Sequence, residues 1–434
     1  MLKATSVALA LALAGAGAPA QDLTVIHAGN LLDGNGGAAR HNVSLILQGD
    51  KIAGIENGFV EKPGAKIIDL SNQTVMPGLI DCHIHIAARL PGKSNRVQER
   101  MTHSDIDVAF EASVYGRDML LQGFTSARDL GGGDATVGLK KAIDKGIVPG
   151  PRLWTALEPL GPTAGHGDPR NGMDPHLDNS SWKNGIVDSP EEGRFRVREH
   201  HRRGADVIKI MPSGGIASTG DDPRAQLMSD DEIKEIVATA HGIGLKVAAH
   251  TYPSGAIRAA VLAGVDSIEH GSFIDEDTSK LMKSHGTYLV PTLTVYDIFM
   301  KAALEHPEQL APGTAEKEIA NDAIPIRNLP IPYKVGVKLA YGTDIGEGDH
   351  AREFALLEQA GVSRQDAILS ATGNAADLLG AADKVGRLLP GHYADIIAVD
   401  GDPLTDLAAM HKVGFVMKGG VVYKTGGQPT INAR

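Results

Sequence analysis

Residues 206–252 read DVIKIMPSGGIASTGDDPRAQLMSDDEIKEIVATAHGIGLKVAAHTY, and they decide the fold class. A short apolar run, DVIKIM, is followed by a helical pattern and then by a second apolar run, LKVAAH. Ser229 and Glu232 form an S-x-x-E capping box at the start of the helical pattern. The segment therefore predicts a strand, a helix and a second strand in succession.

The same alternation continues on both sides, from about Leu79 to about Asp383. SGAIRAAVLAGV reads as a helix, and DSIEHG, TYLVPTL and KLAYGTD read as later strands. Repeated strand–helix units over this length predict a parallel α/β barrel rather than an antiparallel sandwich. Residues 161–190 are rich in Gly, Pro, Asp and Asn and predict a long loop.

The two ends of the chain have a different pattern. Residues 22–77 and 386–425 hold short apolar runs separated by Gly, Asn and Asp, which is typical of short strands. We expect both ends to pair into one small β-sandwich beside the barrel. The expected division is a sandwich part at 22–77, the barrel at 78–383 and a second sandwich part at 384–434.

The first 20 residues, MLKATSVALALALAGAGAPA, have the order of a secretory signal peptide cleaved after Ala20. The alternative is a first helix of the mature fold, which the short, Ala-rich run disfavours. We expect a secreted or periplasmic protein, without a membrane anchor after cleavage, because no other stretch is long and apolar enough to cross a bilayer.

Composition excludes several classes of function. The 434 residues include 42 Lys and Arg against 53 Asp and Glu, a net charge of -11, which argues against nucleic acid as a partner. A single Cys excludes an intramolecular disulfide framework. Hydrophobic residues at 42% and charged residues at 22% are typical of a globular protein.

Two histidines are the first candidate metal ligands in the sequence. His83 and His85 lie in PGLIDCHIHI, and residues two apart on a strand face the same side. Two imidazoles on one face suit a metal ion, although two ordinary histidines would give the same pattern. Cys82 would then face the other way, as a small buried residue.

Three further residues follow apolar strands: His250, His270 and Asp344. The carboxyl ends of barrel strands meet at one face, so we expect these side chains to converge with the histidine pair. Lys209, within DVIKIM, is flanked by apolar residues, where a free ammonium is costly to bury. It is either an ion-paired or snorkelling lysine, or one that has reacted with carbon dioxide to give a carbamate.

These motifs together resemble the amidohydrolase superfamily over nearly the whole mature chain. PGLIDCHIH, DVIKI, AHTY, IEHG and YGTD resemble its metal-binding strands, and TGNAADLLG and GHYADIIAVDGDPL resemble its closing elements. The resemblance implies a (β/α)₈ TIM barrel with a composite β-sandwich from both termini. It also implies two divalent metal ions, usually zinc, bridged by a carboxylated lysine.

Carried over by position, the resemblance gives each residue a role. His83 and His85 would bind the more buried metal together with Asp344. Lys209, as its carbamate, would bridge the metals, and His250 and His270 would bind the second. Asp344 would also accept the proton of the attacking water and deliver it to the leaving nitrogen.

Within the superfamily, the chain is most similar to a branch of Xaa-Pro dipeptidases, N-acyl amino acid carboxypeptidases and ochratoxinases. The shared segments are TSARDLGG at 125–132, GHGD at 165–168, HTY at 250–252 and VDSIEHG at 265–271. The resemblance makes His166 a contact of the scissile carbonyl and Tyr252 a contact of the substrate carboxylate. Arg128 could hold a carboxylate or be a structural partner of Asp129, and we favour the structural role.

The expected reaction is cleavage of a C-terminal amide that releases an amino acid from N-acyl amino acids, dipeptides or ochratoxin A-like compounds. Two alternatives stay open: hydrolysis of a cyclic amide or imidazolone, and a secreted metal-binding protein with an inactive barrel. The loops EPLGPTA and IGEGDHARE depart from the branch, and loops of this kind determine substrate choice in barrels. By resemblance we also expect a homo-oligomer, commonly an octamer.

Overall fold

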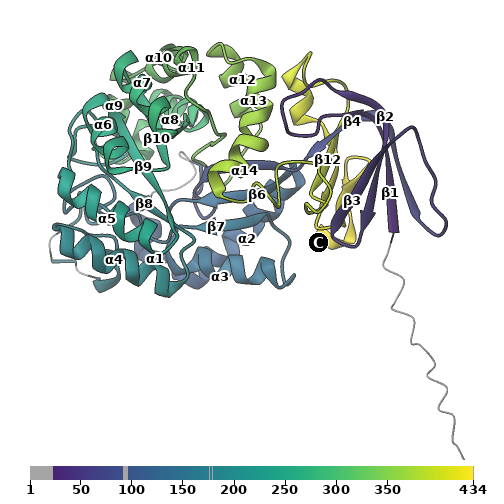
Figure 1. Ribbon diagram of the computed structural model, residues 1–434. Helices are drawn as coiled ribbons and strands as arrows, with labels where there is room; N and C mark the ends of the chain where they lie inside the picture. The colour runs from purple at the N-terminus through teal and green to yellow at the C-terminus, as the bar shows by residue number, and fades with distance from the viewer. Residues whose placement is uncertain (1–22, 91–95, 175, 178, 434) are drawn as a thin grey trace, which may run out of the picture.

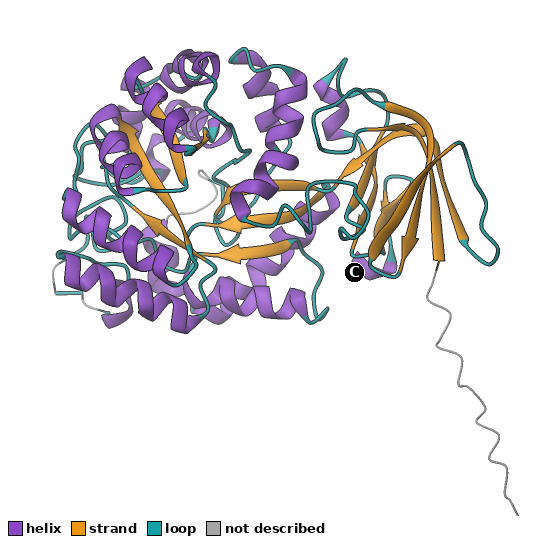
Figure 2. Ribbon diagram, viewed as in Figure 1, coloured by secondary structure: helices purple, strands orange, loops and turns teal. Residues whose placement is uncertain are grey.

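The computed structural model describes residues 23–90, 96–174, 176–177 and 179–433. The expected signal peptide, at 1–20, lies outside the described residues. A larger part contains strands surrounded by helices, and a smaller part consists mainly of strands (Figures 1 and 2). The first strands of the chain, in purple, and the last, in yellow, lie side by side in the smaller part (Figure 1).

The larger part is built on two parallel sheets. One joins β5 (Leu79–Ile84), β6 (Phe124–Asp129) and β7 (Arg152–Thr155). The other joins β8 (Val207–Ile210), β9 (Lys246–Pro253), β10 (Ser267–Phe273) and β11 (Tyr288–Val290). Backbone hydrogen bonds connect the sheets, since Asp206 N donates to Thr155 O at 2.8 Å and Leu160 N donates to Lys209 O at 2.8 Å.

Residues 338–344 close the barrel as its eighth position. Ala340 N donates to Leu289 O of β11 at 3.0 Å, and Cys82 N of β5 donates to Tyr341 O at 2.7 Å. The segment is not a regular strand, and Asp344 has a φ of 60°. The expected (β/α)₈ barrel is confirmed, with its last strand position irregular where Asp344 lies.

Helices follow the strands and cover the outside of the barrel (Figure 2). Ser229 and Glu232 form the expected capping box at the start of α5. The helices that belong to this layer are α1 (Arg96–Thr102), α2 (Asp105–Leu121), α3 (Gly133–Asp144), α4 (Pro190–Arg203), α5 (Asp230–Gly242), α6 (Ser254–Ala263), α7 (Glu276–His285), α12 (Arg352–Gln359), α13 (Arg364–Ser370) and α14 (Gly373–Leu379). Between β7 and α4 the described chain holds only the short η1 (Ser180–Lys183), as expected for a long loop.

A group of shorter helices separates β11 from the eighth barrel position: α8 (Leu293–Glu305), η2 (Pro307–Gln309), α9 (Thr314–Ala320), α10 (Ile324–Asn328) and α11 (Pro330–Val335). Lys317 of α9 donates to the carbonyl of Ser218 at 2.8 Å, and Asn328 of α10 donates to that of Ser272 at 2.8 Å. Both carbonyls lie at or beyond the carboxyl ends of barrel strands. These helices therefore lie over the face of the barrel where active sites are built.

The smaller part is one eight-stranded sheet in the order β15-β14-β13-β12-β4-β1-β2-β3. Its strands are β1 (Leu23–Leu31), β2 (Arg40–Gln48), β3 (Lys51–Asn57), β4 (Lys66–Pro77), β12 (Ile396–Val399), β13 (Val413–Lys418), β14 (Val421–Thr425) and β15 (Gln428–Pro429), with η3 (Leu407–His411) and η4 (Ile431–Ala433) beside them. The expected assembly from both termini is confirmed, and hydrogen bonds run through all eight strands.

The alternation of side chains along β12 shows how this sheet is packed. Ile396 and Ala398 belong to a core within the sheet itself, together with residues of β1, β2 and β13. Ile397 and Val399 belong to the main core that includes the barrel. Successive strand residues face opposite sides, so one face of β12 packs into the core of the terminal sheet and the other face packs into the core that includes the barrel.

The boundaries of the domains stay a prediction. Between the terminal sheet and the barrel only Gly78 separates β4 from β5, and Gly78 N donates to Asp395 O at 2.9 Å. Across the ranges that the structure describes, no helix combines the length and apolar character needed to cross a membrane.

Candidate metal centre and substrate pocket

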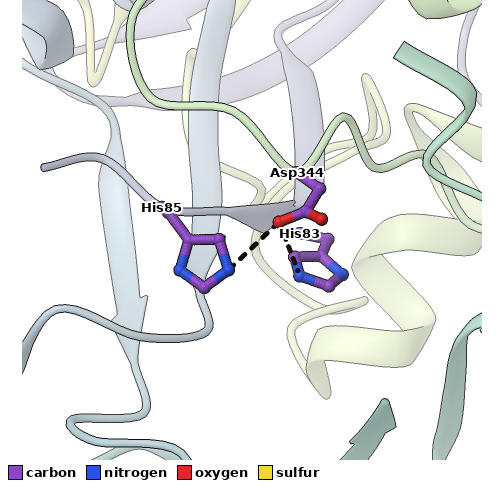
Figure 3. Close-up of side chains that lie close together, drawn as sticks. All are labelled: His83, His85 and Asp344. Carbon is purple, nitrogen blue, oxygen red and sulfur yellow. Dashed lines mark ion pairs between the residues drawn. The ribbon is translucent and has the colours of Figure 1, made fainter. Parts of the chain in front are cut away.

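Three predicted ligands meet at the carboxyl end of β5 (Figure 3). Asp344 Oδ1 lies 3.0 Å from His85 Nε2 and 3.3 Å from His83 Nε2. The ligand atoms of the three residues all lie within 4.8 Å of one another. The alternation of β5 brings both imidazoles to one side, and Cys82 is buried with a different apolar cluster, as expected.

The other nitrogen of each imidazole is already bonded. His83 Nδ1 lies 2.8 Å from Glu269 Oε2, and His85 Nδ1 lies 3.0 Å from the carbonyl of Gly131. Both partners only accept hydrogen bonds, so each Nδ1 donates, and each Nε2 is the nitrogen that a cation beside Asp344 would contact once its proton is lost. Two nitrogen acceptors and a carboxylate converging in this way fit a divalent cation.

Asp344 is ionised in this arrangement. Burial by itself would raise the pKa of its carboxyl, but His83 and His85 outweigh burial and hold that pKa well below its ordinary value. The pKa of His85 is raised, because Asp344 outweighs the opposing effect of burial. Each group favours the charge of the other, and a bound cation would take over the stabilisation of the carboxylate.

A buried carboxylate that motif reasoning missed fixes the orientation of His83. Glu269 is fully buried and accepts hydrogen bonds from His83 and, at 2.8 Å, from Arg128 Nη2. Burial would raise the pKa of Glu269, but Arg128 and His83 hold it far below its ordinary value. The position next to His270 was the only signal in the sequence that could have pointed to Glu269.

Arg128 has the structural role that we favoured, but the expected partner was wrong. It bonds to Glu269 and to the carbonyl of Cys82, at 2.5 Å, rather than to Asp129. Neighbouring residues on β6 face opposite ways, so Asp129 instead accepts from the backbone of Ile86 and Gly131. Burial raises the pKa of Asp129 to about 6.

Lys209 lies at the bottom of the pocket. Its side chain is 1% exposed, and Nζ lies 3.4 Å from His83 Nε2. Among the described residues, no carboxylate forms a salt bridge with it. Burial lowers the pKa of its amine to about 8, against the attraction of Glu269 and Asp344. The neutral amine is the form that reacts with carbon dioxide, so the site fits the expected carbamate.

His250 and His270 lie beside this group. The ring centroids of His250 and His270 are 4.6 Å apart, and that of His270 is 5.2 Å from that of His83. Burial lowers the pKa of both imidazoles well below the ordinary value, and the neutral form is the one that binds metals. They lie outside the set of three ligands within 4.8 Å, and their binding of a second metal stays a prediction.

The strand ends at these histidines differ from expectation. β9 and β10 continue past them to Pro253 and Phe273. His270 has a φ of 70°, and the pairing of β10 with β9 shifts register after it. This left-handed conformation is costly for a residue with a Cβ, and such strain is concentrated at functional sites.

His166 and Tyr252 lie beside His250 and His270, and these four rings form what we call the aromatic wall of the pocket. The ring of His166 stacks on His250, with centroids 4.2 Å apart and an angle of 16° between the planes. The ring of Tyr252 stacks on His270 at 5.2 Å. Burial lowers the pKa of His166 to about 4 and raises that of Tyr252, so both side chains are neutral near pH 7.

A hydrogen-bonded chain holds His166 in its loop. Nδ1 of His166 lies 2.7 Å from Ser218 Oγ, and Ser218 donates to Asp221. Lys317 of α9 donates to the same carboxylate at 2.9 Å. The loop after β8 and the helix α9 thus act together to position His166.

His350, whose role the sequence left open, supports the segment that carries Asp344. His350 Nδ1 lies 3.0 Å from Asp81 Oδ2, and Thr343 Oγ1 donates to the same oxygen at 2.7 Å. The side chain of His350 is buried and is not part of the pocket lining. Its contacts give it a structural role.

All eight predicted site residues line one pocket. The sequence missed the part of the lining that comes from α8 and α9. The complete lining is His83, His85, His166, Lys209, Met211, Ile216, Ala217, His250, Tyr252, His270, Val295, Tyr296, Phe299, Glu318 and Asp344.

Three comparisons with known proteins agree with this geometry. Ochratoxinase of Aspergillus niger is 33% identical, over 93% of this chain and 87% of the relative. A Xaa-Pro dipeptidase, solved with methionine bound in the active site, has a TM-score of 0.88 and 32% identity, covering 93% of this chain and 100% of the other. A prolidase complexed with N-methylphosphonate-L-proline has a TM-score of 0.86 and 34% identity, with coverage of 93% and 100%.

The fold and the pocket define a (β/α)₈-barrel hydrolase with a candidate metal site. The amidohydrolase family model matches residues 74–423, from within β4 to within β14. The chain therefore belongs to the amidohydrolase family, as its motifs indicated.

Proposed function

We propose that this amidohydrolase cleaves a C-terminal amide or peptide bond with a metal-activated water, releasing an amino acid from N-acyl amino acids, dipeptides or ochratoxin A-like compounds. The observation that carries the proposal is the convergence of His83, His85 and Asp344 in a pocket that also holds Lys209. Amide hydrolysis needs an activated water, a proton acceptor and a group that contacts the scissile carbonyl, and the pocket holds a candidate for each.

Two divalent metal ions, which we propose are zinc, would lower the pKa of a water molecule and polarise the substrate carbonyl when bound. His83, His85 and Asp344 would hold one ion, and His250 and His270 the other. Lys209, as its carbamate, would contribute to both. Support for the carbamate comes from the burial of Lys209 and its distance of 3.4 Å from His83 Nε2.

The proton is moved by Asp344. Its carboxylate is ionised and lies at the junction of the three ligands, where the water must attack. Asp344 accepts the proton of that water and delivers it to the leaving nitrogen as the carbon–nitrogen bond breaks. Both transfers need only one carboxylate, because the water and the leaving nitrogen meet at the same carbon.

Substrate contacts come from the aromatic wall. His166 lines the pocket and is held at Nδ1 by Ser218, and its ring would contact the scissile carbonyl. Tyr252 keeps its hydroxyl proton, so it donates to the substrate carboxylate. Two relatives support an amino-acid product, since one is a Xaa-Pro dipeptidase with methionine in its active site and another is an ochratoxinase.

The assignment extends to location and assembly. Residues 1–20 would direct export, so the mature protein would act in the periplasm or outside the cell. We also propose a homo-oligomer. These two proposals are supported by the sequence pattern and by resemblance.

Amino-acid release tests the proposed function directly. The mature chain, purified with zinc and bicarbonate, is assayed against N-acyl amino acids, dipeptides and ochratoxin A. We expect release from at least one class, loss of release after chelation and recovery when zinc is restored. Bound metal with no release from any member would exclude the peptidase-like assignment and make cyclic amides the next candidates.

A further inference from the structure

Glu318 is a carboxylate inside the pocket that the catalytic account does not use. It lies on α9, its side chain is 3% exposed, and it lines the same pocket as the predicted metal ligands. A charged group in such a position is costly unless it is paired. The described part of the chain offers it no hydrogen-bond donor and no salt bridge.

Lys317, which precedes Glu318 in the sequence, is bonded to other groups. Lys317 donates to the carbonyls of Gly215 and Ser218 and to the carboxylate of Asp221, at 2.9, 2.8 and 2.9 Å. These bonds use all three protons of the ammonium. They hold α9 against the loop after β8 and leave Glu318 without a side-chain partner among the described residues.

The electrostatics of Glu318 agree with this geometry. Burial raises the pKa of its carboxyl to about 8, and Asp322 raises it further. No group in the described protein opposes these two effects. A cation entering the pocket would lower the pKa and leave the carboxylate ionised and paired.

Three aromatic side chains line the same pocket as Glu318. Tyr296 and Phe299 lie on α8, which packs against α9, and Tyr252 lies on β9. The rings of Tyr252 and Tyr296 are 6.3 Å apart and inclined at 72°. Burial raises the pKa of both tyrosine hydroxyls, so both keep their protons near neutral pH.

We propose that Glu318, with Tyr296 and Phe299, binds a protonated amine of the substrate, so that the pocket selects basic amides. A carboxylate and aromatic faces are the two kinds of group that stabilise an ammonium in a desolvated site. This inference rests on the proposed function and narrows its substrate class. The amine could be the free amino terminus of a dipeptide or the side chain of the released residue.

The alternative is that Glu318 stays protonated and donates a hydrogen bond to a neutral substrate. Glu318→Gln separates the two, because the amide keeps the size and a donor but removes the charge. Glu318→Asp keeps the charge on a shorter side chain. Glu316→Gln, an exposed residue on the same helix, is the matched control.

Four compounds test whether Glu318 binds the amino terminus or the side-chain amine of the substrate. N-acetyl-L-lysine and N-acetyl-L-methionine differ in the side-chain charge, and L-alanyl-L-methionine and its N-acetyl form differ at the amino terminus. For the zinc-loaded enzyme we expect the cationic member of one pair to have the higher kcat/KM. Glu318→Gln should reduce that preference roughly 10- to 100-fold, the range for a charge-assisted hydrogen bond. Glu318→Asp should retain part of it, and Glu316→Gln should match the wild type.

If Glu318→Gln lowers kcat/KM equally for the charged and neutral compounds, or does not lower it at all, the inference is overturned. A wild-type enzyme with the higher kcat/KM for the neutral member of both pairs would also overturn it. If no compound is hydrolysed, the proposed function fails, and calorimetric binding of the same four compounds still decides the inference. Weaker binding of only the cationic compounds to Glu318→Gln supports it, and unchanged binding contradicts it.

Discussion

Nδ1 of His83 lies 2.8 Å from Oε2 of Glu269, although the two residues are 186 positions apart in the chain. The carboxylate fixes the ring so that Nε2, rather than Nδ1, faces Asp344. Arg128 holds the other oxygen of Glu269 at 2.8 Å. A buried ion pair thus orients a predicted metal ligand without itself lining the pocket.

Glu269→Gln should weaken metal binding. The amide cannot hold both His83 and Arg128 as the carboxylate does, and loss of such a partner typically costs about 10- to 100-fold in metal affinity. Competition against a chromogenic chelator measures the affinity. Glu276→Gln, an exposed change on α7, is the control, and an unchanged affinity in Glu269→Gln would show that this contact does not support the metal.

Gly215→Ala should remove the contribution of His166 while leaving the metal in place. A Cβ at Gly215 would overlap the imidazole of His166, which must then move from its position against His250. We expect kcat/KM to fall roughly 100-fold, because the ring would no longer be placed against the scissile carbonyl. Gly255→Ala, where a Cβ meets nothing within 4 Å, should have normal activity. Equal activity in the two variants would separate His166 from catalysis.

Lys209→Met should lower the amount of bound metal. Methionine fills the buried position but cannot form a carbamate or any oxygen ligand. Metal analysis of the purified protein should show a loss relative to the wild type, and native mass spectrometry of the wild type should show the added mass of carbon dioxide. Full metal occupancy in Lys209→Met would rule out a bridging role.

Glu318 should make the protein less stable as the pH rises. Its pKa is raised from 4.5 to about 8 in the folded state, chiefly by burial, so between these values the folded protein holds a proton that the unfolded chain has lost. The stabilisation is complete below pH 4.5 and declines toward pH 8, by about 1.4 kcal/mol per pH unit. The melting temperature of metal-free Glu318→Gln should therefore fall less than that of the metal-free wild type between pH 5 and 8. Parallel melting curves would show that this carboxyl is ionised throughout.

The sequence predicted the barrel and the ligands for physical reasons that are local. His83 and His85 are two apart on a strand, and the carboxyl ends of parallel strands meet whatever the loops do. Glu269 was not predictable in the same way. It precedes His270 in β10, and the alternation of an ideal strand gives no reason for both to turn toward the metal ligands. The φ of 70° at His270 breaks that alternation.

The place of Glu318 in the pocket could not be predicted from the sequence for a different reason. It comes from a seven-residue helix in the connection between β11 and the eighth barrel position, with no motif around it. Its place in the pocket depends on Lys317 binding the loop after β8, a contact across 96 residues or more. Long-range contacts of this kind decide substrate choice in barrels, which is why the pattern indicates the chemistry better than the substrate.

The most direct test of the account compares the wild type with Asp344→Asn in the same amino-acid release assay, with bound metal measured in both. Asparagine can neither accept the proton of the attacking water nor carry the negative charge at the junction of the ligands. The account predicts release by the wild type and a loss of roughly 100-fold or more in the variant, with the fold retained. Release at the wild-type rate by Asp344→Asn, or a well-folded wild type without stoichiometric metal, would contradict it.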